Sequence, residues 1–223
     1  MPRISTEAAL RGPDWGRLGL TGNPFENVAP GERLEWVCVP DGVRRALAAR
    51  PFRVELVGPK GAGKSTVLRA LLAELPRAQL RYLAPGDRLA LPDPGVETFA
   101  VDEADRASPG ELRLLGRDAD RRGLSLLFGT HRPLAADLGL ALSSFALAEA
   151  PALEWVGKRV AARRIGDTPR FEEVAARLWP KLGTNYGVLR ALYELAEELA
   201  RGAPLDDEAI SAALGKARAA AGE

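Results

Sequence analysis

Short apolar runs alternate with segments of helical periodicity through residues 51–150. Five apolar runs predict strands, at 53–57, 79–83, 98–101, 124–128 and 144–147. Between them, the spacing of apolar positions predicts helices over 67–75, 109–122 and 133–142. Strands that alternate with helices are typical of a parallel sheet with helices on its faces. This part of the chain therefore reads as an α/β domain.

The flanking parts of the chain have a different pattern. Residues 1–50 form a lead-in with scattered Gly and Pro and one predicted helix over 41–49, whereas residues 151–223 read as helical throughout. There, apolar residues recur at helical spacing, at Leu189, Leu192, Leu195 and Leu199. Opposite charges stand one turn apart in the pairs Arg190–Glu194 and Glu197–Arg201. We expect three segments, 1–50, 51–150 and 151–223.

Between the first strand and the next helix lies a glycine-rich loop with the pattern G-x-x-x-x-G-K-[ST]. Its residues are Gly58, Pro59, Lys60, Gly61, Ala62, Gly63, Lys64, Ser65 and Thr66. In this context the pattern indicates a phosphate-binding loop. Glycines let successive backbone N–H groups face a phosphate, and the helix start adds its positive end. We expect Lys64 to contact the β- and γ-phosphates of ATP and Ser65 to bind Mg²⁺.

Two acids follow the third predicted strand, in the sequence TFAVDEAD at residues 98–105. Ligands of open α/β sheets bind at the carboxyl ends of the strands, where Asp102 and Glu103 would lie. Asp102 suits a role at the Mg²⁺ ion, and Glu103 is placed to act as a general base toward water. A DEAD-box helicase is excluded because 223 residues cannot hold two recombinase-like domains.

The fourth predicted strand ends in Gly129-Thr130-His131. A polar side chain at the tip of the strand beside the Asp-Glu strand can hold an attacking water, and Thr130 is the candidate. His131 is the only histidine of the chain. We interpret it as a turn residue or helix cap without a chemical role.

Together these motifs resemble those of the AAA+ ATPases over about residues 20–200. The loop at 58–66 matches Walker A, 99–103 matches Walker B, and Thr130 falls at the sensor-1 position. The chain looks most like the bacterial branch of transposition ATPases, secretion-assembly ATPases and origin-recognition-type initiators. The resemblance implies an α/β, parallel-sheet P-loop NTPase core followed by a small all-helical lid. It also implies that Asn23-Pro24-Phe25 and Val39-Pro40 cover the adenine.

The first departure from the family pattern lies in the connection at residues 84–96. Three prolines, Pro85, Pro92 and Pro94, disfavour a helix there, and the segment between Leu83 and Thr98 contains no aromatic residue. Polypeptide-threading AAA+ machines carry a helix and an aromatic pore loop in this region. The sequence therefore argues against an unfoldase.

A second departure concerns arginines. No arginine occurs between Arg132 and Arg159, where oligomeric relatives place the finger that completes a neighbouring site, so Arg132 is the nearest candidate. The turn Gly183-Thr184-Asn185 resembles the start of the sensor-2 helix, yet Gly187 occupies the expected arginine position. Arg190, one turn later, could substitute or be a solvated surface residue. These gaps predict slow hydrolysis, or hydrolysis that needs a partner's residue.

Two basic clusters are candidate contacts to nucleic acid, which requires cations that neutralise phosphates. The first is Arg113, Arg117 and Arg121, and the second is Lys158, Arg159, Arg163 and Arg164. Arg159 stands one turn from Trp155, so cation–π stacking is expected. The alternative for each cluster is a salt-bridged, solvated face.

Composition and net charge limit the classes of protein to which this chain can belong. The net charge of +1 argues against a broadly basic protein that coats nucleic acid, and no apolar run approaches 18 residues. The N-terminus lacks the apolar centre of a signal peptide, and the single Cys38 implies no disulfide framework. We expect a cytoplasmic enzyme. Among 31 basic residues 26 are arginine, and there are 17 prolines, which suits either a thermophile or a GC-rich genome.

Three functional hypotheses remain open. The first is a Mg²⁺-dependent ATPase that remodels or positions a partner complex, with DNA as one setting. The second is a nucleotide-dependent switch or adaptor with little turnover, favoured by the missing finger arginine. The third is a small-molecule P-loop kinase, disfavoured by Glu103 and by the helical C-terminal segment.

Overall fold

The computed structural model describes residues 12–26, 37–139, 141–147 and 153–221 and divides the chain into two compact units. An α/β unit is formed by residues 33–150, and a helical unit by residues 1–32 together with 151–223. The division falls inside the expected lead-in of residues 1–50. Its first part belongs with the C-terminal helices and its last part with the sheet.

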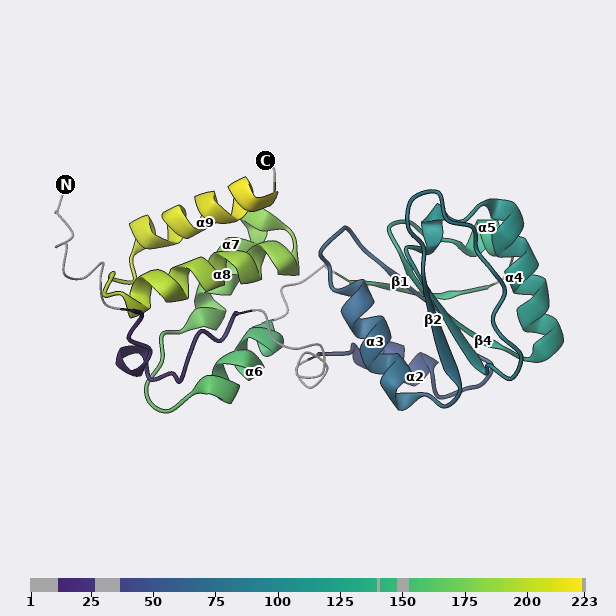
Figure 1. Ribbon diagram of the computed structural model, residues 1–223, viewed down its shortest axis with the longest axis horizontal. Helices are drawn as coiled ribbons and strands as arrows, with labels where there is room; N and C mark the ends of the chain where they lie inside the picture. The colour runs from purple at the N-terminus through teal and green to yellow at the C-terminus, as the bar shows by residue number, and fades with distance from the viewer. Residues whose placement is uncertain (1–11, 27–36, 140, 148–152, 222–223) are drawn as a thin grey trace. The chain divides into compact units, whose positions relative to one another are not determined.

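A five-stranded, fully parallel sheet organises the α/β unit (Figure 1). Its strands are β1 (Arg53–Val57), β2 (Ala78–Tyr82), β3 (Thr98–Asp102), β4 (Ser125–Thr130) and β5 (Ser143–Ala146). The order across the sheet is β2-β3-β4-β1-β5. The predicted α/β class and parallel sheet are thereby confirmed. Because β4 lies between β1 and β3, the ends of these three strands stand next to one another.

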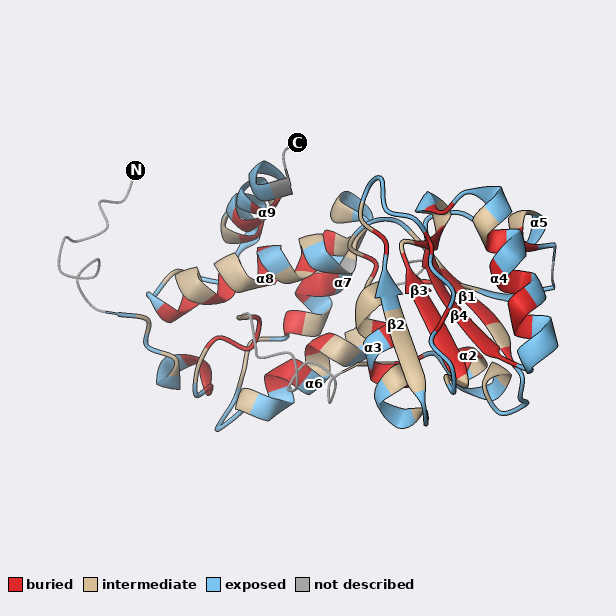
Figure 2. Cartoon of the chain, turned by 45° about the vertical axis from the view of Figure 1, so that its right-hand side comes forward, coloured by how far each residue is buried: buried red, intermediate tan, exposed pale blue. Residues whose placement is uncertain are grey.

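Helices cover both faces of this sheet. They are α2 (Asp41–Ala46), α3 (Lys64–Glu74), α4 (Pro109–Arg122) and α5 (Ala135–Leu138), and a 3₁₀ turn, η3 (Ala104–Arg106), follows β3. Alternate strand residues enter two separate cores, as the period of a strand requires. Phe99 and Val101 pack in the cluster that contains α4 and α5, whereas Ala100 packs in the cluster that contains α2 and α3. Figure 2 shows the central strands buried between these layers.

The connection from β2 to β3 contains no helix, as its prolines predict. Arg122 at the end of α4 fastens it by donating to the carbonyl oxygens of Pro92 (3.2 Å) and Asp93 (2.9 Å). The helix predicted over 133–142 is much shorter, because α5 ends at Gly139. That residue has φ of 67°, in the left-handed region where a helix stops.

Among the described residues, the helical unit consists of four helices and the segment 12–26. The helices are α6 (Leu153–Arg163), α7 (Phe171–Leu182), α8 (Asn185–Ala200) and α9 (Asp207–Ala221), and the segment contains the 3₁₀ turn η2 (Gly16–Leu18). Leu192, Leu195 and Leu199 are buried in its core, as their spacing predicts. The segment joins this core through Leu20 and Phe25, and the ring of Phe25 meets that of Phe171 edge-on at 5.1 Å.

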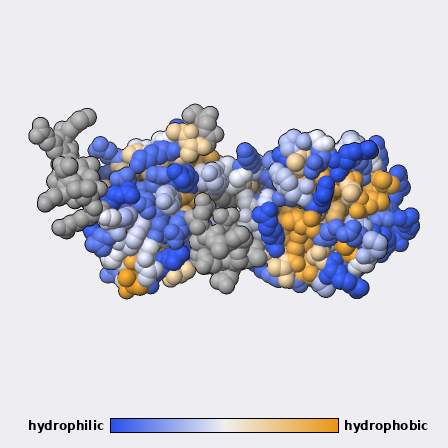
Figure 3. Space-filling model, viewed as in Figure 1, coloured by the Kyte–Doolittle hydropathy of each residue, from blue (hydrophilic) through white to orange (hydrophobic). Residues whose placement is uncertain are grey.

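The surfaces of the two units differ in the view of Figure 3, where the helical unit is mostly hydrophilic and apolar residues gather on the α/β unit. None of the helices in the described ranges combines the length and apolar character that crossing a bilayer requires.

Candidate nucleotide site

The loop between β1 and α3 has the backbone conformation that its glycines permit. Gly61 and Gly63 have φ of 83° and 95°, which L-residues with a side chain rarely adopt. Gly63 is the N-cap of α3 and supplies no side-chain cap. The first N–H groups of a helix have no partner within it, so those of Lys64 and Ser65 are left for an external acceptor. This loop can therefore cradle a phosphate at the positive end of α3.

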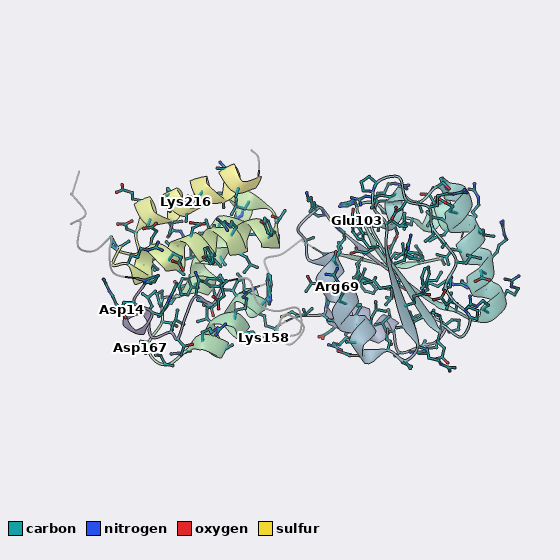
Figure 4. All side chains as sticks on the ribbon, viewed as in Figure 1. Asp14, Arg69, Glu103, Lys158, Asp167 and Lys216 are labelled. Carbon is teal, nitrogen blue, oxygen red and sulfur yellow. The ribbon has the colours of Figure 1, made fainter. Side chains whose placement is uncertain are left out.

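Lys64 is buried in this loop, and its Nζ donates to the carbonyl oxygens of Gly58 (2.7 Å) and Pro59 (2.9 Å). Burial lowers the pKa of Lys64 from its ordinary value, while the charges of Glu103, Asp102 and Asp105 oppose that shift. The three carboxylates thus lie within electrostatic reach of the ammonium group. Figure 4 places Glu103 at the end of the sheet where this loop lies.

Asp102 is buried at the end of β3 and accepts a hydrogen bond from the backbone N–H of Glu103 (3.2 Å). Its partner across the sheet is Gly129 of β4. A Cβ at position 129 would stand 2.7 Å from the Asp102 Oδ1. Glycine at this position therefore leaves the space that the carboxylate occupies.

Thr130, the last residue of β4, is fully buried between the ends of β1 and β3. Its carbonyl oxygen accepts from the N–H of Gly58 (3.1 Å), which joins the loop to β4. Its hydroxyl donates to the carbonyl oxygen of Arg132 (2.7 Å) and lies 3.3 Å from Asp105 Oδ1. The structure thus places Thr130 beside the strand that ends in Asp102, with its hydroxyl engaged by the protein.

Asp105 and His131 join this site, and sequence reasoning gave neither a role. Asp105 accepts from the N–H of His131 (3.2 Å), and its Oδ2 lies 3.3 Å from His131 Nδ1. That ring nitrogen lies 3.7 Å from Glu103 Oε2. Burial raises the pKa of Asp105, but the hydrogen bonds and charge of His131 outweigh it and leave the pKa below its ordinary value. The sequence offered one signal for this pair. Asp105 follows β3 and His131 follows β4, and parallel strands that are neighbours end at the same edge of a sheet.

Arg106 is the other residue that sequence reasoning missed. Glu103 has φ of 59° and opens η3, and this tight turn brings Arg106 back onto it, with Nη2 2.8 Å from Glu103 Oε2. The same guanidinium donates to Leu83 O (2.7 Å) and to the hydroxyl of Tyr82 (3.2 Å). The expected general base is therefore held by an ion pair.

The remaining candidate residues come from α2, from the segment after β4 and from the helical unit. Pro40 is the N-cap of α2, and Arg132 is paired with Asp137 of α5 at 2.6 Å. Arg190 belongs to the helical unit, where it pairs with Glu194 at 2.6 Å, as its spacing predicts, and lies over the ring of Tyr193. Asn23, whose segment was expected to cover an adenine, is buried in the helical unit and donates to Tyr193 O (3.2 Å).

The two basic clusters differ. Arg113, Arg117 and Arg121 are exposed on α4, and Arg121 pairs with the buried Asp118 at 2.5 Å. In the second cluster the expected stacking of Arg159 on Trp155 is present, at 5.5 Å.

Arg159 nevertheless lies inside the helical unit and not on its surface. This side chain is only 5% exposed and donates to Pro24 O (2.7 Å) and Glu26 O (2.6 Å). Its neighbours are also paired within the unit, Lys158 with Glu154 and Arg163 with Glu26.

Ser65 and Asp102 offer hydroxyl and carboxylate oxygens, the hard ligands that Mg²⁺ prefers. Within the described residues there is no group of three or more His, Cys, Asp or Glu that could hold a metal by itself. This donor set fits an ion that proteins bind through one or two side chains, with substrate phosphates and water completing its coordination.

Compared with known protein families and with curated proteins, the chain matches no family model and no curated relative. The geometry of the site therefore carries the functional proposal.

Proposed function

We propose that this chain is a Mg²⁺-dependent ATP-binding and ATP-hydrolysing protein of the AAA+ kind. One observation carries the proposal, the buried Lys64 in a glycine-rich loop with Asp102 and Glu103 within electrostatic reach. Buried charges are costly unless they are paired, so such a group at the carboxyl end of a parallel sheet favours a binding site.

Phosphate binding would use groups whose hydrogen-bond partners within the protein are neutral and therefore weaker than a phosphate. The Lys64 ammonium contacts two neutral carbonyl oxygens, Gly58 O and Pro59 O. A phosphate oxygen forms a stronger, charge-assisted hydrogen bond with an ammonium group. The first N–H groups of α3 add further donors. A bound triphosphate would therefore accept hydrogen bonds both from the Lys64 ammonium group and from the first N–H groups of α3.

Ser65 and Asp102 would hold the Mg²⁺ ion. When bound, this ion neutralises charge on the β- and γ-phosphates. Asp102 is suited to the task because it is buried and its carboxylate accepts a hydrogen bond from the N–H of Glu103.

Glu103 would supply the general base of hydrolysis. Its carboxylate accepts a proton from water while the water oxygen bonds to the γ-phosphorus and the bond between that phosphorus and the β–γ bridging oxygen breaks. The electron pair of the broken bond leaves with ADP. Thr130, Asp105 and His131 would fix the strand end beside Glu103, since their hydrogen bonds join the tip of β4 to η3.

A nucleotide-dependent switch with little turnover is the second candidate. This candidate is favoured by the surroundings of Arg132, the arginine nearest to the expected finger position. Arg132 forms an ion pair with Asp137 of the same unit, so its guanidinium is already engaged within this chain. The sequence has no other arginine before Arg159. In this version a partner protein would complete the site. The bound nucleotide would determine how the protein positions that partner, which could be bound to DNA.

Calorimetric titration with ATP tests the binding step. The wild-type protein should bind ATP with Mg²⁺, and Lys64→Ala should weaken binding by at least about a hundredfold, the scale of a charged hydrogen bond in a buried site. Arg69→Ala is the matched control, because Arg69 is an exposed cation of α3 outside the loop. Equal affinities of wild type and Lys64→Ala, or no binding by the wild type, would contradict the proposal.

A further inference from the structure

We propose that Arg106 restrains catalysis by locking Glu103, so that hydrolysis requires the guanidinium to leave the carboxylate. The inference rests on the proposed function and concerns the regulation of the same site. It starts from the contact of 2.8 Å between Arg106 Nη2 and Glu103 Oε2.

The turn itself enforces this contact. Glu103 has φ of 59°, and the N–H of Arg106 donates to Glu103 O at 3.0 Å. A 3₁₀ turn places side chains three residues apart on the same side. The ion pair is therefore built into the backbone that follows β3.

The end of β2 anchors the guanidinium from its other side. Arg106 Nη1 donates to Leu83 O (2.7 Å) and to the Tyr82 hydroxyl (3.2 Å), and the guanidinium lies 5.8 Å from the centre of the Tyr82 ring. These bonds hold the guanidinium beside Glu103, where its Nη2 forms the ion pair with Oε2. A single arginine thereby connects the end of β2 with the general base.

Two neighbouring groups crowd one oxygen of the Glu103 carboxylate. Glu103 Oε2 has Arg106 at 2.8 Å and His131 Nδ1 at 3.7 Å, and its side chain is 14% exposed. A water must donate a hydrogen to this carboxylate before it can attack, and the Arg106 guanidinium stands at one of the two oxygens that could accept that hydrogen. The Arg106 side chain is 32% exposed, so it can move toward solvent.

Single-turnover ATP hydrolysis tests the lock. Arg106→Gln should raise the hydrolysis rate roughly fivefold over wild type with ATP affinity unchanged, since it releases a partly exposed ion pair. Tyr82→Phe keeps the ring but loses the acceptor of one hydrogen bond, so a smaller increase is expected. Arg88→Gln is the matched control, because Arg88 is 92% exposed and pairs with Glu111. A rate for Arg106→Gln equal to or below that of wild type would overturn the lock.

A double variant shows whether the effect passes through Glu103. The Glu103→Gln, Arg106→Gln protein should hydrolyse ATP as slowly as Glu103→Gln alone. A merely structural role of Arg106 would not produce this dependence. If the double variant keeps the increase seen in Arg106→Gln, the lock on Glu103 is refuted.

A measurement without nucleotide separates failure of the lock from failure of the proposed function. In nucleotide-free protein the Nη hydrogens of Arg106, observed by nitrogen-15 NMR, should exchange slowly with water and become fast in Glu103→Ala. Fast exchange in the wild type would overturn the lock even if ATP is hydrolysed. Absent ATP binding would refute the proposed function, and with it the regulation of hydrolysis, even if the ion pair is observed.

Discussion

The two units use buried polar residues differently. Among the described residues of the helical unit, the buried polar side chains are Asn23 and Arg159, and both fasten the segment 12–26 to the helices. The α/β unit buries a larger set, namely Glu55, Lys64, Thr98, Asp102, Asp118, Ser125 and Thr130. Some of these also have structural roles, as Glu55 accepts from the N–H of Leu134 (2.8 Å) and from the Ser144 hydroxyl.

What separates the units is whether buried charges of both signs lie near one another. Arg159 is satisfied by two backbone carbonyl oxygens. In the α/β unit, Lys64 and Asp102 lie close to the end of the sheet with only backbone groups as their hydrogen-bond partners. Burial alone therefore does not identify a site, whereas buried charges of both signs at the ends of parallel strands do favour one.

The largest effect is expected at Glu103, the proposed general base of the α/β unit. Glu103→Gln should slow ATP hydrolysis by about 10²–10⁴-fold, because an amide cannot accept the proton of water. ATP affinity, measured by titration, should stay near the wild-type value. Hydrolysis at the wild-type rate would remove Glu103 from the mechanism.

Next in size is the buried cation of the helical unit. Arg159→Met should lower the free energy of unfolding by about 2–3 kcal/mol, since it leaves Pro24 O and Glu26 O without their charged donor. Urea unfolding followed by tryptophan fluorescence measures this unit, which contains Trp15, Trp155 and Trp179.

Arg163→Met provides the control for Arg159→Met. Arg163 pairs with Glu26 and its side chain is 32% exposed, so this variant should cost less than about 1 kcal/mol. A similar cost for the two variants would show that burial of Arg159 adds nothing to stability.

A glycine-to-alanine substitution should change the stability of the two units in opposite directions. Gly129→Ala should destabilise the protein by about 1–3 kcal/mol and weaken Mg²⁺-dependent ATP binding, because the added Cβ meets Asp102 Oδ1 at 2.7 Å and Leu68 Cδ1 at 3.0 Å. Gly215→Ala, on α9 with nothing within 4 Å, should stabilise by about 0.5–1 kcal/mol. Chemical denaturation measures both, and destabilisation by Gly215→Ala would contradict the comparison.

The smallest effect concerns pH. The pKa of Asp105 is lowered in the folded protein, so its contribution to stability is present above the unfolded value of about 4 and is lost as pH falls through the lower folded value. Asp105→Asn should therefore be less stable than wild type at pH 7, by less than about 1 kcal/mol, and the difference should shrink below pH 4. Unfolding curves at several pH values measure this, and a constant difference would exclude titration of Asp105 as its source.

Much of the architecture was determined by the sequence. Apolar runs bounded by turn residues located the strands, and α4 has the predicted bounds, 109–122, because Ser108 and Glu111 form a capping box and Gly123 ends the helix. The sequence also located the loop at 58–66 and the acids after β3, since these motifs are local. Their assignment to ATP and Mg²⁺ stays a prediction.

Only the tertiary structure decided which side chains meet. The sheet order β2-β3-β4-β1-β5 brings His131 to Asp105 and Glu103, although the sequence places it after a different strand. The left-handed backbone of Glu103 turns Arg106 onto the carboxylate that the sequence had left free. Likewise, Arg159 looked like a surface cation, but the segment 12–26 folds over it. Local patterns determine elements, whereas strand order and chain packing determine partners, because those depend on residues far apart in sequence.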